Sequence, residues 1–458
     1  MTTLADLQDA FAAGRATPIG VAETFLAADP VDGPLAAFRA VHADDVIDQA
    51  RAATERHAAG NAIGPLDGVL VAVKDAVAVA GYRTLAGTRE LAYHDPARDG
   101  AVEATLVRRL RDAGAVIAGK THTTELGLSP TGTSGAQPTP RNPHDLSRLT
   151  GGSSSGTGAA VAAGLTTVGV GSDGGGSIRI PAAVCGVFGI KPSWGVVPGD
   201  GTAPVGWWSL DHLGPLARCA DDLATVLGVL ADRRYDVVDR PLRYGVDWAW
   251  WGQPDPAVDA PCRAAAAELS PTPVTIPGIE LARTAGYATA LSELTAGIWE
   301  TLRDRPEAFS ADIRTAVAQA ANISGADYLR AQQVRQLLAD GLDRAFDDVD
   351  VLLVPTVALP APPRPSDADL AEGVLDTDLI DAMTAYTFPA NLCGLPAASV
   401  PVGVTPGTGP GSGLPIGLQV VGRRGDDATV LAACAALERA GLAVRPRPRS
   451  EHATLSDL

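Results

Sequence analysis

The sequence predicts an α/β fold with a central β-sheet that helices cover on both faces. Two short apolar segments, 69–74 and 115–120, have the composition of strands that are buried on both sides. Between them, residues 101–114 follow the pattern of an amphipathic helix that a glycine ends. This alternation of helix and buried strand is typical of an α/β sheet whose two faces are both covered.

The remaining elements follow from the same patterns. Thr17 and Pro18 form a cap and first turn, and Ser310 is a second cap, so each marks the start of a helix. A proline-rich exposed loop is expected over 358–369 and a flexible turn over 405–413. Further helices are expected over 43–60, 220–231, 262–269, 281–303, 324–346 and 426–440, and buried strands over 349–355, 397–404 and 415–422, the last two paired.

Composition and charge narrow the class of protein. The chain has 458 residues, of which 46% are hydrophobic and 19% charged, so it is long and apolar enough for a substantial core. The net charge of −17 argues against nucleic acid as a partner, since phosphate binding needs clustered lysine and arginine. The sequence shows neither a signal peptide nor a membrane span, and its five cysteines are scattered. A cytoplasmic protein without disulfides, metal or cofactor is therefore expected.

Residues 151–181 read GGSSSGTGAAVAAGLTTVGVGSDGGGSIRIP and contain two turns rich in glycine and serine. Such loops bring backbone N–H groups close to a bound group, because glycine has no Cβ. A phosphate site is disfavoured, since the lysine of a Walker loop is missing. Ser153, Ser154 and Ser155 are also compatible with simple turn formation, and Ser177 with a helix cap.

Lys74 changes the interpretation of these serines. One interpretation of Lys74 is an ordinary solvated lysine at the end of a strand, at the edge of the sheet. On a buried strand, however, a lysine loses its charge readily and can act as a base for a serine. Three consecutive glycines before Ser177 would direct backbone N–H groups at one oxyanion. The seven histidines offer no competing triad or HExxH spacing, and His122 and His212, which are nearest the motif, are interpreted as structural.

The stretch from 151 to 182 resembles the signature of the amidase signature family along its whole length. The resemblance covers most of residues 60–232 and about the last seventy residues, whereas the middle of the chain matches no motif. The other matching segments are VKDAVAVAG at 73–81, DGAVEATLVRRLRDAGAVIAGKTHTTELG at 99–127, GIKPSWGVVP at 189–198, SLDHLGPLAR at 209–218 and PANLCGLPAASVPVG at 389–403.

The resemblance implies a Ser–cisSer–Lys triad and a mixed central sheet. Ser177 would be the nucleophile, Ser153 the serine that relays the proton, and Lys74 the base. It also implies a cis peptide bond between Gly152 and Ser153. The remaining implied site residues are Gly174, Gly175 and Gly176 with the N–H of Ser177 as oxyanion donors, Ser154 as a supporting hydroxyl, and Asp173 and Arg179 as braces of the oxyanion loop.

The expected organisation is a single amidase domain over 1–458. It comprises a catalytic core at 60–232, a variable segment at 233–375 that shapes the pocket entrance, and C-terminal strands and a helix at 376–458 that complete the core.

Three features bear on the substrate. Gly174 stands where many family members carry a larger residue, which would widen the space beside the oxyanion loop. Trp207 and Trp208 follow the central motifs, and Tyr386 and Phe388 precede PANLCG. If these aromatic residues line the pocket, an aryl or bulky apolar amide is favoured; the alternative is that they pack in the core.

Three functional hypotheses remain open from the sequence. The first is an amidase that cleaves C–N bonds of small linear amides, with esterase activity or carbamate (urethane) hydrolysis by the same triad as close variants. The second is the catalytic subunit of a glutamyl-tRNA amidotransferase, which needs a partner. The third is a non-catalytic binding protein, which the intact triad disfavours. The expected partner is a small-molecule amide or carbamate, with no nucleic acid and no membrane, and the chain is expected to be a monomer or homodimer.

Overall fold

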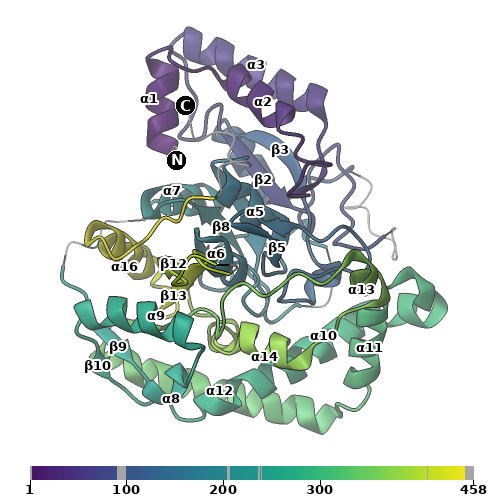
Figure 1. The fold of residues 1–458 in the computed structure, drawn as a ribbon, viewed down its shortest axis with the longest axis vertical. Coiled ribbons are helices and arrows are strands. Elements are labelled where there is room, and N and C mark those ends of the chain that lie inside the picture. The colour runs from purple at the N-terminus through teal and green to yellow at the C-terminus, as the bar shows by residue number, and fades with distance from the viewer. Residues whose placement is uncertain are drawn as a thin grey trace.

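The computed structural model describes residues 3–89, 100–203, 207–235, 238, 240–409 and 411–448. In these residues eleven strands form one mixed sheet in the order β1-β3-β2-β6-β8-β7-β12-β13-β11-β9-β10, and two form a small separate pair. Figure 1 shows this sheet at the centre of the molecule with helices around it. The strands are β1 Phe38–Ala40, β2 Leu70–Lys74, β3 Val116–Thr121, β4 Arg141–Asn142, β5 Asp145–Leu149, β6 Val168–Ser172, β7 Phe188–Lys191, β8 Leu213–Ala217, β9 Tyr244–Val246, β10 Thr272–Pro273, β11 Val351–Pro355, β12 Ala397–Val404 and β13 Pro415–Gly422.

The predicted α/β class is confirmed, and the sheet is mixed. Strands β3, β2 and β6 run parallel, whereas β6 and β8, β8 and β7, β7 and β12, and β12 and β13 pair antiparallel. The two C-terminal strands pair as predicted, with Ala397 opposite Val421. The variable middle of the chain also contributes to this sheet, because β9, β10 and β11 form its far edge.

Strand β2 shows how both faces are covered. Val71 and Val73 pack in one hydrophobic cluster with residues of α4 and α7, whereas Leu70 and Ala72 pack in another with residues of α5. This alternation follows from the two-residue period of a strand. Lys74 has the parity of Leu70 and Ala72, so its side chain belongs to the face that α5 covers.

The helices begin and end largely where their sequence patterns indicate. Thr17 and Ser310 accept hydrogen bonds at the starts of α2 and α11, as predicted for caps. In Figure 1, α1, α2 and α3 lie at one end of the sheet, and α10, α11 and α12 lie at the other. The helices are α1 Leu4–Ala12, α2 Pro18–Ala27, α3 Ala43–Ala58, α4 Thr105–Asp112, α5 Ser155–Ala163, α6 Arg179–Cys185, α7 Ala220–Ala231, α8 Trp248–Trp251, α9 Pro256–Glu268, α10 Ala282–Asp304, α11 Ala311–Ala320, α12 Gly325–Asp348, α13 Asp367–Glu372, α14 Thr377–Thr384, α15 Phe388–Leu392 and α16 Asp427–Arg439, with short 3₁₀ turns η2 Glu125–Gly127, η3 Ile279–Leu281 and η4 Pro306–Ala308.

Two predicted segments differ from the structure. The helix expected over 101–114 begins only at Thr105, because the N–H of Ala104 pairs with the carbonyl of Ala78 in the preceding loop. The proline-rich loop is not uniformly exposed, since Ala361 is buried. The N–H of Leu149, in β5, donates to the carbonyl of Pro362, which holds this segment against the protein.

Candidate active site

Lys74 lies at the carboxyl end of β2 and is buried. Its Nζ donates to Ser153 Oγ at 2.8 Å, to Ser172 Oγ at 2.9 Å and to the Ser172 carbonyl at 3.3 Å. Burial lowers the pKa of Lys74 below its ordinary value of 10.5, because the charged ammonium loses its water. The lysine is therefore arranged to exchange a proton with Ser153.

Ser153 belongs to the turn that precedes α5. The peptide bond between Gly152 and Ser153 is cis, as the resemblance implies. The Ser153 carbonyl accepts a hydrogen bond from Thr123 Oγ1 at 2.9 Å, which fixes the turn against the end of β3. The adjacent Ser154 donates its hydroxyl to the Ser172 carbonyl at 3.3 Å, and its N–H to the Ser177 carbonyl at 3.2 Å. Ser154 thus joins the two glycine-rich loops.

The second glycine-rich loop runs from Asp173 to Ser177 and leads into α6. Among the described residues, no hydrogen-bond partner faces the backbone N–H groups of Gly174, Gly175 or Ser177. The N–H of Gly176 instead donates to Asp173 Oδ1 at 2.7 Å. The expectation that Gly176 supplies an oxyanion donor is therefore wrong, because the Asp173 carboxylate already occupies that N–H.

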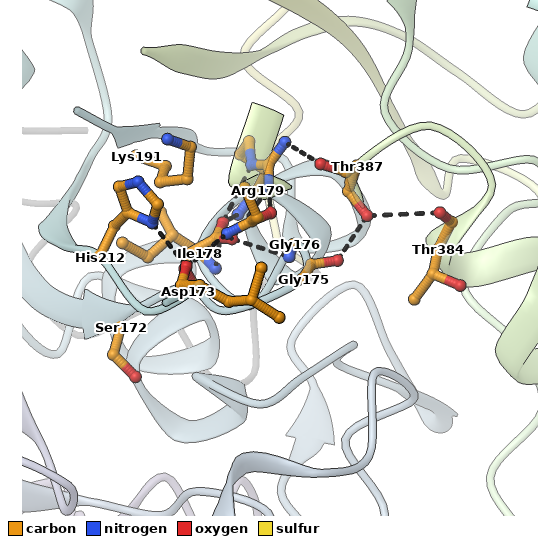
Figure 2. Close-up of polar contacts among 12 residues, drawn as sticks. Ser172, Asp173, Gly175, Gly176, Ile178, Arg179, Lys191, His212, Thr384 and Thr387 are labelled. Carbon is orange, nitrogen blue, oxygen red and sulfur yellow. Dashed lines mark hydrogen bonds and ion pairs between the residues drawn. The ribbon is translucent and has the colours of Figure 1, made fainter. Parts of the chain in front are cut away.

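Asp173 and Arg179 form a buried ion pair that braces this loop. Arg179 Nε and Nη2 donate to the two oxygens of the Asp173 carboxylate, each at 2.9 Å. Arg179 Nη1 also donates to the Thr387 carbonyl at 3.0 Å and to Gln419 Oε1 at 2.5 Å. The pair holds the pKa of Asp173 well below its usual range, although burial opposes this. Figure 2 shows the contacts of Arg179 with Asp173 and Thr387 beside the loop.

Two supporting residues that the sequence did not single out come from α15 and the residue before it. Thr387 Oγ1 donates to the Gly175 carbonyl at 2.5 Å, as Figure 2 shows. Asn391 Nδ2 donates to the Asp173 carbonyl at 2.7 Å and to Asp173 Oδ1 at 2.9 Å. Asn391 lies within the matched segment PANLCG, so the motif contained a signal for it. Thr387 lies just before that segment, and no signal in the sequence pointed to it.

A cavity of about 230 Å³ opens at the triad, and Lys74, Ser153 and Ser177 all line it. Much of its wall is apolar and comes from the variable middle of the chain through α10 and α11, with α14 beyond them. The apolar residues of the wall that come from η2, these three helices and their connections are Leu126, Leu128, Ala290, Leu291, Ile313, Ala316, Val374, Leu375 and Ile380.

The four aromatic residues expected to line the pocket divide into two pairs. Trp207 and Phe388 line the cavity. Tyr386 does not, because its ring is buried in the core and its hydroxyl donates to the Trp251 carbonyl at 3.0 Å. Trp208 is 61% exposed and lines a neighbouring hollow, which shares Trp207 with the cavity. The expectation for Tyr386 and Trp208 is therefore corrected.

Gly174 does not widen the cavity as expected. A Cβ placed on Gly174 would lie 3.1 Å from Cε3 of Trp207, so the indole ring already occupies the space that a side chain would take. The indole N–H donates to the Leu126 carbonyl at 2.9 Å, which holds the ring in place. Gly175 has the same relation to Phe388, whose ring atom Cε1 would lie 2.9 Å from an added Cβ.

The cavity is rich in carboxyl groups. Burial raises the pKa of Glu125 to about 7, and the Ser310 N–H donates to the Glu125 carboxylate at 3.1 Å. Among the described residues that line the cavity, Lys74 is the only lysine or arginine. The carboxyl groups of the wall are Glu125, Asp211, Asp312 and Asp381.

Other chemistries find less support in the described ranges. No three histidine, cysteine, aspartate or glutamate side chains there come together to hold a metal ion. His122 Nδ1 donates to Gln137 Oε1 at 3.1 Å, and burial lowers the pKa of His122 to about 4. The Nδ1 of His212 pairs with the Leu210 carbonyl at 2.7 Å. As for membranes, none of the helices in the described ranges has both the length and the apolarity needed to cross a bilayer.

Fold and site together are those of an α/β hydrolase whose cavity is lined by the buried Lys74, by Ser153 and by Ser177. Residues 21–431 match the family named Amidase, which is most of the chain, so the protein belongs to the amidase signature family of hydrolases.

Individual relatives agree with this assignment. The chain is 34% identical to a fatty acid amide hydrolase of Medicago truncatula over 95% of this chain and 75% of the relative. It is 33% identical to one of the subunits of the glutamyl-tRNA(Gln) amidotransferase of Chloroflexus aurantiacus, over 98% of each chain. A solved amidase structure superimposes with a TM-score of 0.86 at 32% identity, covering 96% of this chain and all of that one.

Proposed function

We propose that this protein hydrolyses the C–N bond of small amides that carry an aryl or bulky apolar group, through an acyl-enzyme on Ser177. The observation that carries this proposal is the 2.8 Å contact between Lys74 Nζ and Ser153 Oγ at the floor of a largely apolar cavity. A buried lysine with a lowered pKa is the base that a serine nucleophile needs.

The proposed mechanism uses only side chains and backbone groups of this chain. Ser177 Oγ attacks the amide carbonyl while its proton passes to Ser153, whose own proton passes to neutral Lys74. The resulting oxyanion is held by the N–H groups of Gly174, Gly175 and Ser177. Lys74 then returns the proton through Ser153 to the departing amine. Water attacks the acyl-enzyme by the same relay and releases the acid and Ser177.

The charge of the cavity supports neutral amides over glutamine. A glutamine substrate carries an α-carboxylate, and within the described lining no cation other than Lys74 is present to bind it. The carboxyl groups of the wall would repel this α-carboxylate. This argues against the amidotransferase alternative for this chain, although a relative of that name is equally similar.

Carbamate hydrolysis is a second candidate, because attack by Ser177 on a carbamate carbonyl uses the same relay and the same oxyanion donors. Ester cleavage would follow the same course with an alcohol as leaving group.

A side-by-side panel of an anilide, a primary alkyl amide, a peptide amide, an aryl carbamate and glutamine tests the proposal. We expect the highest kcat/KM for the anilide or the aryl carbamate, and essentially none for glutamine. Ser177→Ala should lower kcat by at least about a thousandfold on every substrate. Substantial activity in that variant, or a preference for glutamine, would contradict the proposal.

A further inference from the structure

We propose that Asp211 is a positioning residue for catalysis, whose carboxylate beside Lys74 sets the pH at which the lysine becomes a base. This inference rests on the proposed role of Lys74, but not on which amide is the substrate. Asp211 belongs to the segment SLDHLGP, and no role was expected for it from the sequence.

The fold brings Asp211 to the lysine through backbone pairing. The N–H of Asp173 donates to the His212 carbonyl at 2.8 Å, and the N–H of His212 donates to the Asp173 carbonyl at 3.1 Å. Asp211 therefore lies next to the end of β6, where Ser172 contacts Lys74. Lys74, Ser172 and Asp211 all line the same cavity.

The local backbone structure holds Asp211 in this position. The backbone N–H of Asp211 donates to the Trp207 carbonyl at 2.9 Å, which closes a turn between the cavity-lining tryptophan and β8. The backbone N–H groups of His212 and Asp173 stabilise its charged form. Burial acts in the opposite direction and raises the pKa of Asp211. Attraction to Lys74 is the largest influence that opposes this rise.

The two groups affect each other in a definite direction. A negative Asp211 stabilises the ammonium form of Lys74, so it raises the lysine pKa, whereas burial lowers it. Lys74 works as a base only when it is neutral. The charge on Asp211 therefore shifts the onset of activity to higher pH, while it keeps the lysine basic enough to accept the serine proton.

Other charged groups around this pair are largely neutralised by their own partners. Asp173 also raises the pKa of Lys74, but Arg179 binds its carboxylate at 2.9 Å. On the neighbouring strand, Lys120 lies 3.1 Å from Asp75, which follows Lys74 directly.

Three further groups lie close by. Arg39 also pairs with Asp75, at 2.6 Å. On β7 and the loop before β8, burial lowers the pKa of Lys191 and of His212 well below their ordinary values. Asp211 is thus the acidic group near Lys74 that lacks an arginine or a second lysine as partner in the described residues.

The test measures the pH dependence of Ser177 labelling by a fluorophosphonate probe, which reports on nucleophile activation without any assumption about the substrate. In Asp211→Asn we expect the acid limb of the labelling rate to move down by about one pH unit or more, since a nearby opposite charge shifts a pKa by this amount. The plateau at high pH should fall, because a less basic lysine accepts the proton less readily.

Matched variants separate this role from a structural one. Asp211→Glu keeps the charge and should retain the native acid limb. Asp222→Asn changes a buried carboxyl group on α7 that caps Leu4 far from the cavity, and should leave the limb in place. If Asp211→Asn does not fold, Asp211→Ser serves in its stead, with thermal unfolding as the check.

The outcomes are distinguishable. An acid limb at the native position in folded Asp211→Asn or Asp211→Ser overturns the role of Asp211. No labelling of the native protein, or equal labelling of Ser177→Ala, would instead contradict the proposed nucleophile.

Discussion

At the scale of single residues, the proposed substrate cavity is shaped by contacts between glycines and aromatic rings. Trp207 lies against Gly174, and Phe388 lies against Gly175, so two rings form walls beside the proposed oxyanion donors. Phe388 also meets the ring of Tyr287 edge-on, with centroids 4.9 Å apart. The rings of Trp207 and Phe388 therefore fill the space that side chains on Gly174 and Gly175 would otherwise take.

This arrangement predicts that Gly174→Ala lowers kcat/KM by about tenfold, because the added Cβ displaces Trp207 or the oxyanion loop by a fraction of an ångström. In a Trp207→Phe background, the smaller ring leaves room for the methyl group, and the same substitution should cost less. Steady-state kinetics on the four proteins of this double-mutant cycle measure the coupling.

Gly325→Ala is the matched control, since an added Cβ there meets no atom within 4 Å. Its kcat/KM should equal that of the native protein. Additive effects of Gly174→Ala and Trp207→Phe would show that the ring and the glycine do not act on each other.

At the scale of elements, neighbouring segments hold the oxyanion loop in addition to its own hydrogen bond between the Gly176 N–H and Asp173. The Asp173 carboxylate accepts hydrogen bonds from Arg179 at the start of α6 and from Asn391 in α15. Thr387 Oγ1 donates a hydrogen bond to the Gly175 carbonyl. Arg179 extends the contact to Gln419 in β13. A loop of consecutive glycines is intrinsically mobile, so these external contacts supply the order that catalysis requires.

Arg179→Ala should therefore destabilise the protein by about 3–5 kcal/mol, because it leaves the buried Asp173 carboxylate without its cation. Urea unfolding at neutral pH measures this loss. The contribution of Asp173 to the free energy of unfolding depends on pH because its pKa is lower in the folded protein than in the unfolded chain. This contribution is fully present above the unfolded pKa near 3.8, and it is lost as the pH falls through the folded pKa. The difference between variant and native protein should thus narrow in acid.

Arg303→Ala is a suitable comparison, since the ion pair between Arg303 and Asp304 is about 60% exposed on both sides. Exposed pairs contribute little, so its unfolding curve should overlay the native one. A similarly small effect of Arg179→Ala would show that the buried pair is not what orders the loop.

At the scale of the whole molecule, the variable middle of the chain is joined to the catalytic part through Ser209. Its N–H donates to Glu293 of α10 at 3.1 Å. Arg335 of α12 donates to Ser209 Oγ at 3.0 Å and to its carbonyl at 2.9 Å. Ser209 lies between the cavity residues Trp207 and Asp211, so helices distant in sequence fix the segment that carries both.

We expect Arg335→Ala to lower kcat/KM by about tenfold while the fold is retained, because the segment from Trp207 to Asp211 loses two hydrogen bonds. Circular dichroism and steady-state kinetics check the two parts of this prediction. Arg330 is on the same helix, but its side chain is 75% exposed and pairs with Asp327. Arg330→Ala should therefore leave kcat/KM and the circular dichroism spectrum unchanged. Equal kinetics for the two variants would argue against a coupling through Ser209.

Much of the fold was predictable because its elements carry strong local patterns. The buried strands at 69–74, 349–355 and 415–422 are apolar runs, and they were found within about one or two residues. The start of α4 and the buried proline-rich segment were missed, because backbone contacts with distant loops decide them. The antiparallel β8 and the contribution of β9 to β11 to the sheet also depend on pairing, which leaves no periodic signal.

The sequence alone determined the set of chemical groups: Lys74 ends a buried strand, and Ser153 and Ser177 lie on glycine-rich loops. These features depend on local composition and on a motif, so they can be recognised from the amino-acid sequence without a structure. Only the tertiary structure decided that Trp207 fills the space over Gly174, that the N–H of Gly176 is occupied, and that Asp211 and Lys74 line the same cavity. The physical reason is that cavity shape and electrostatics depend on through-space distances between segments that are far apart in the chain.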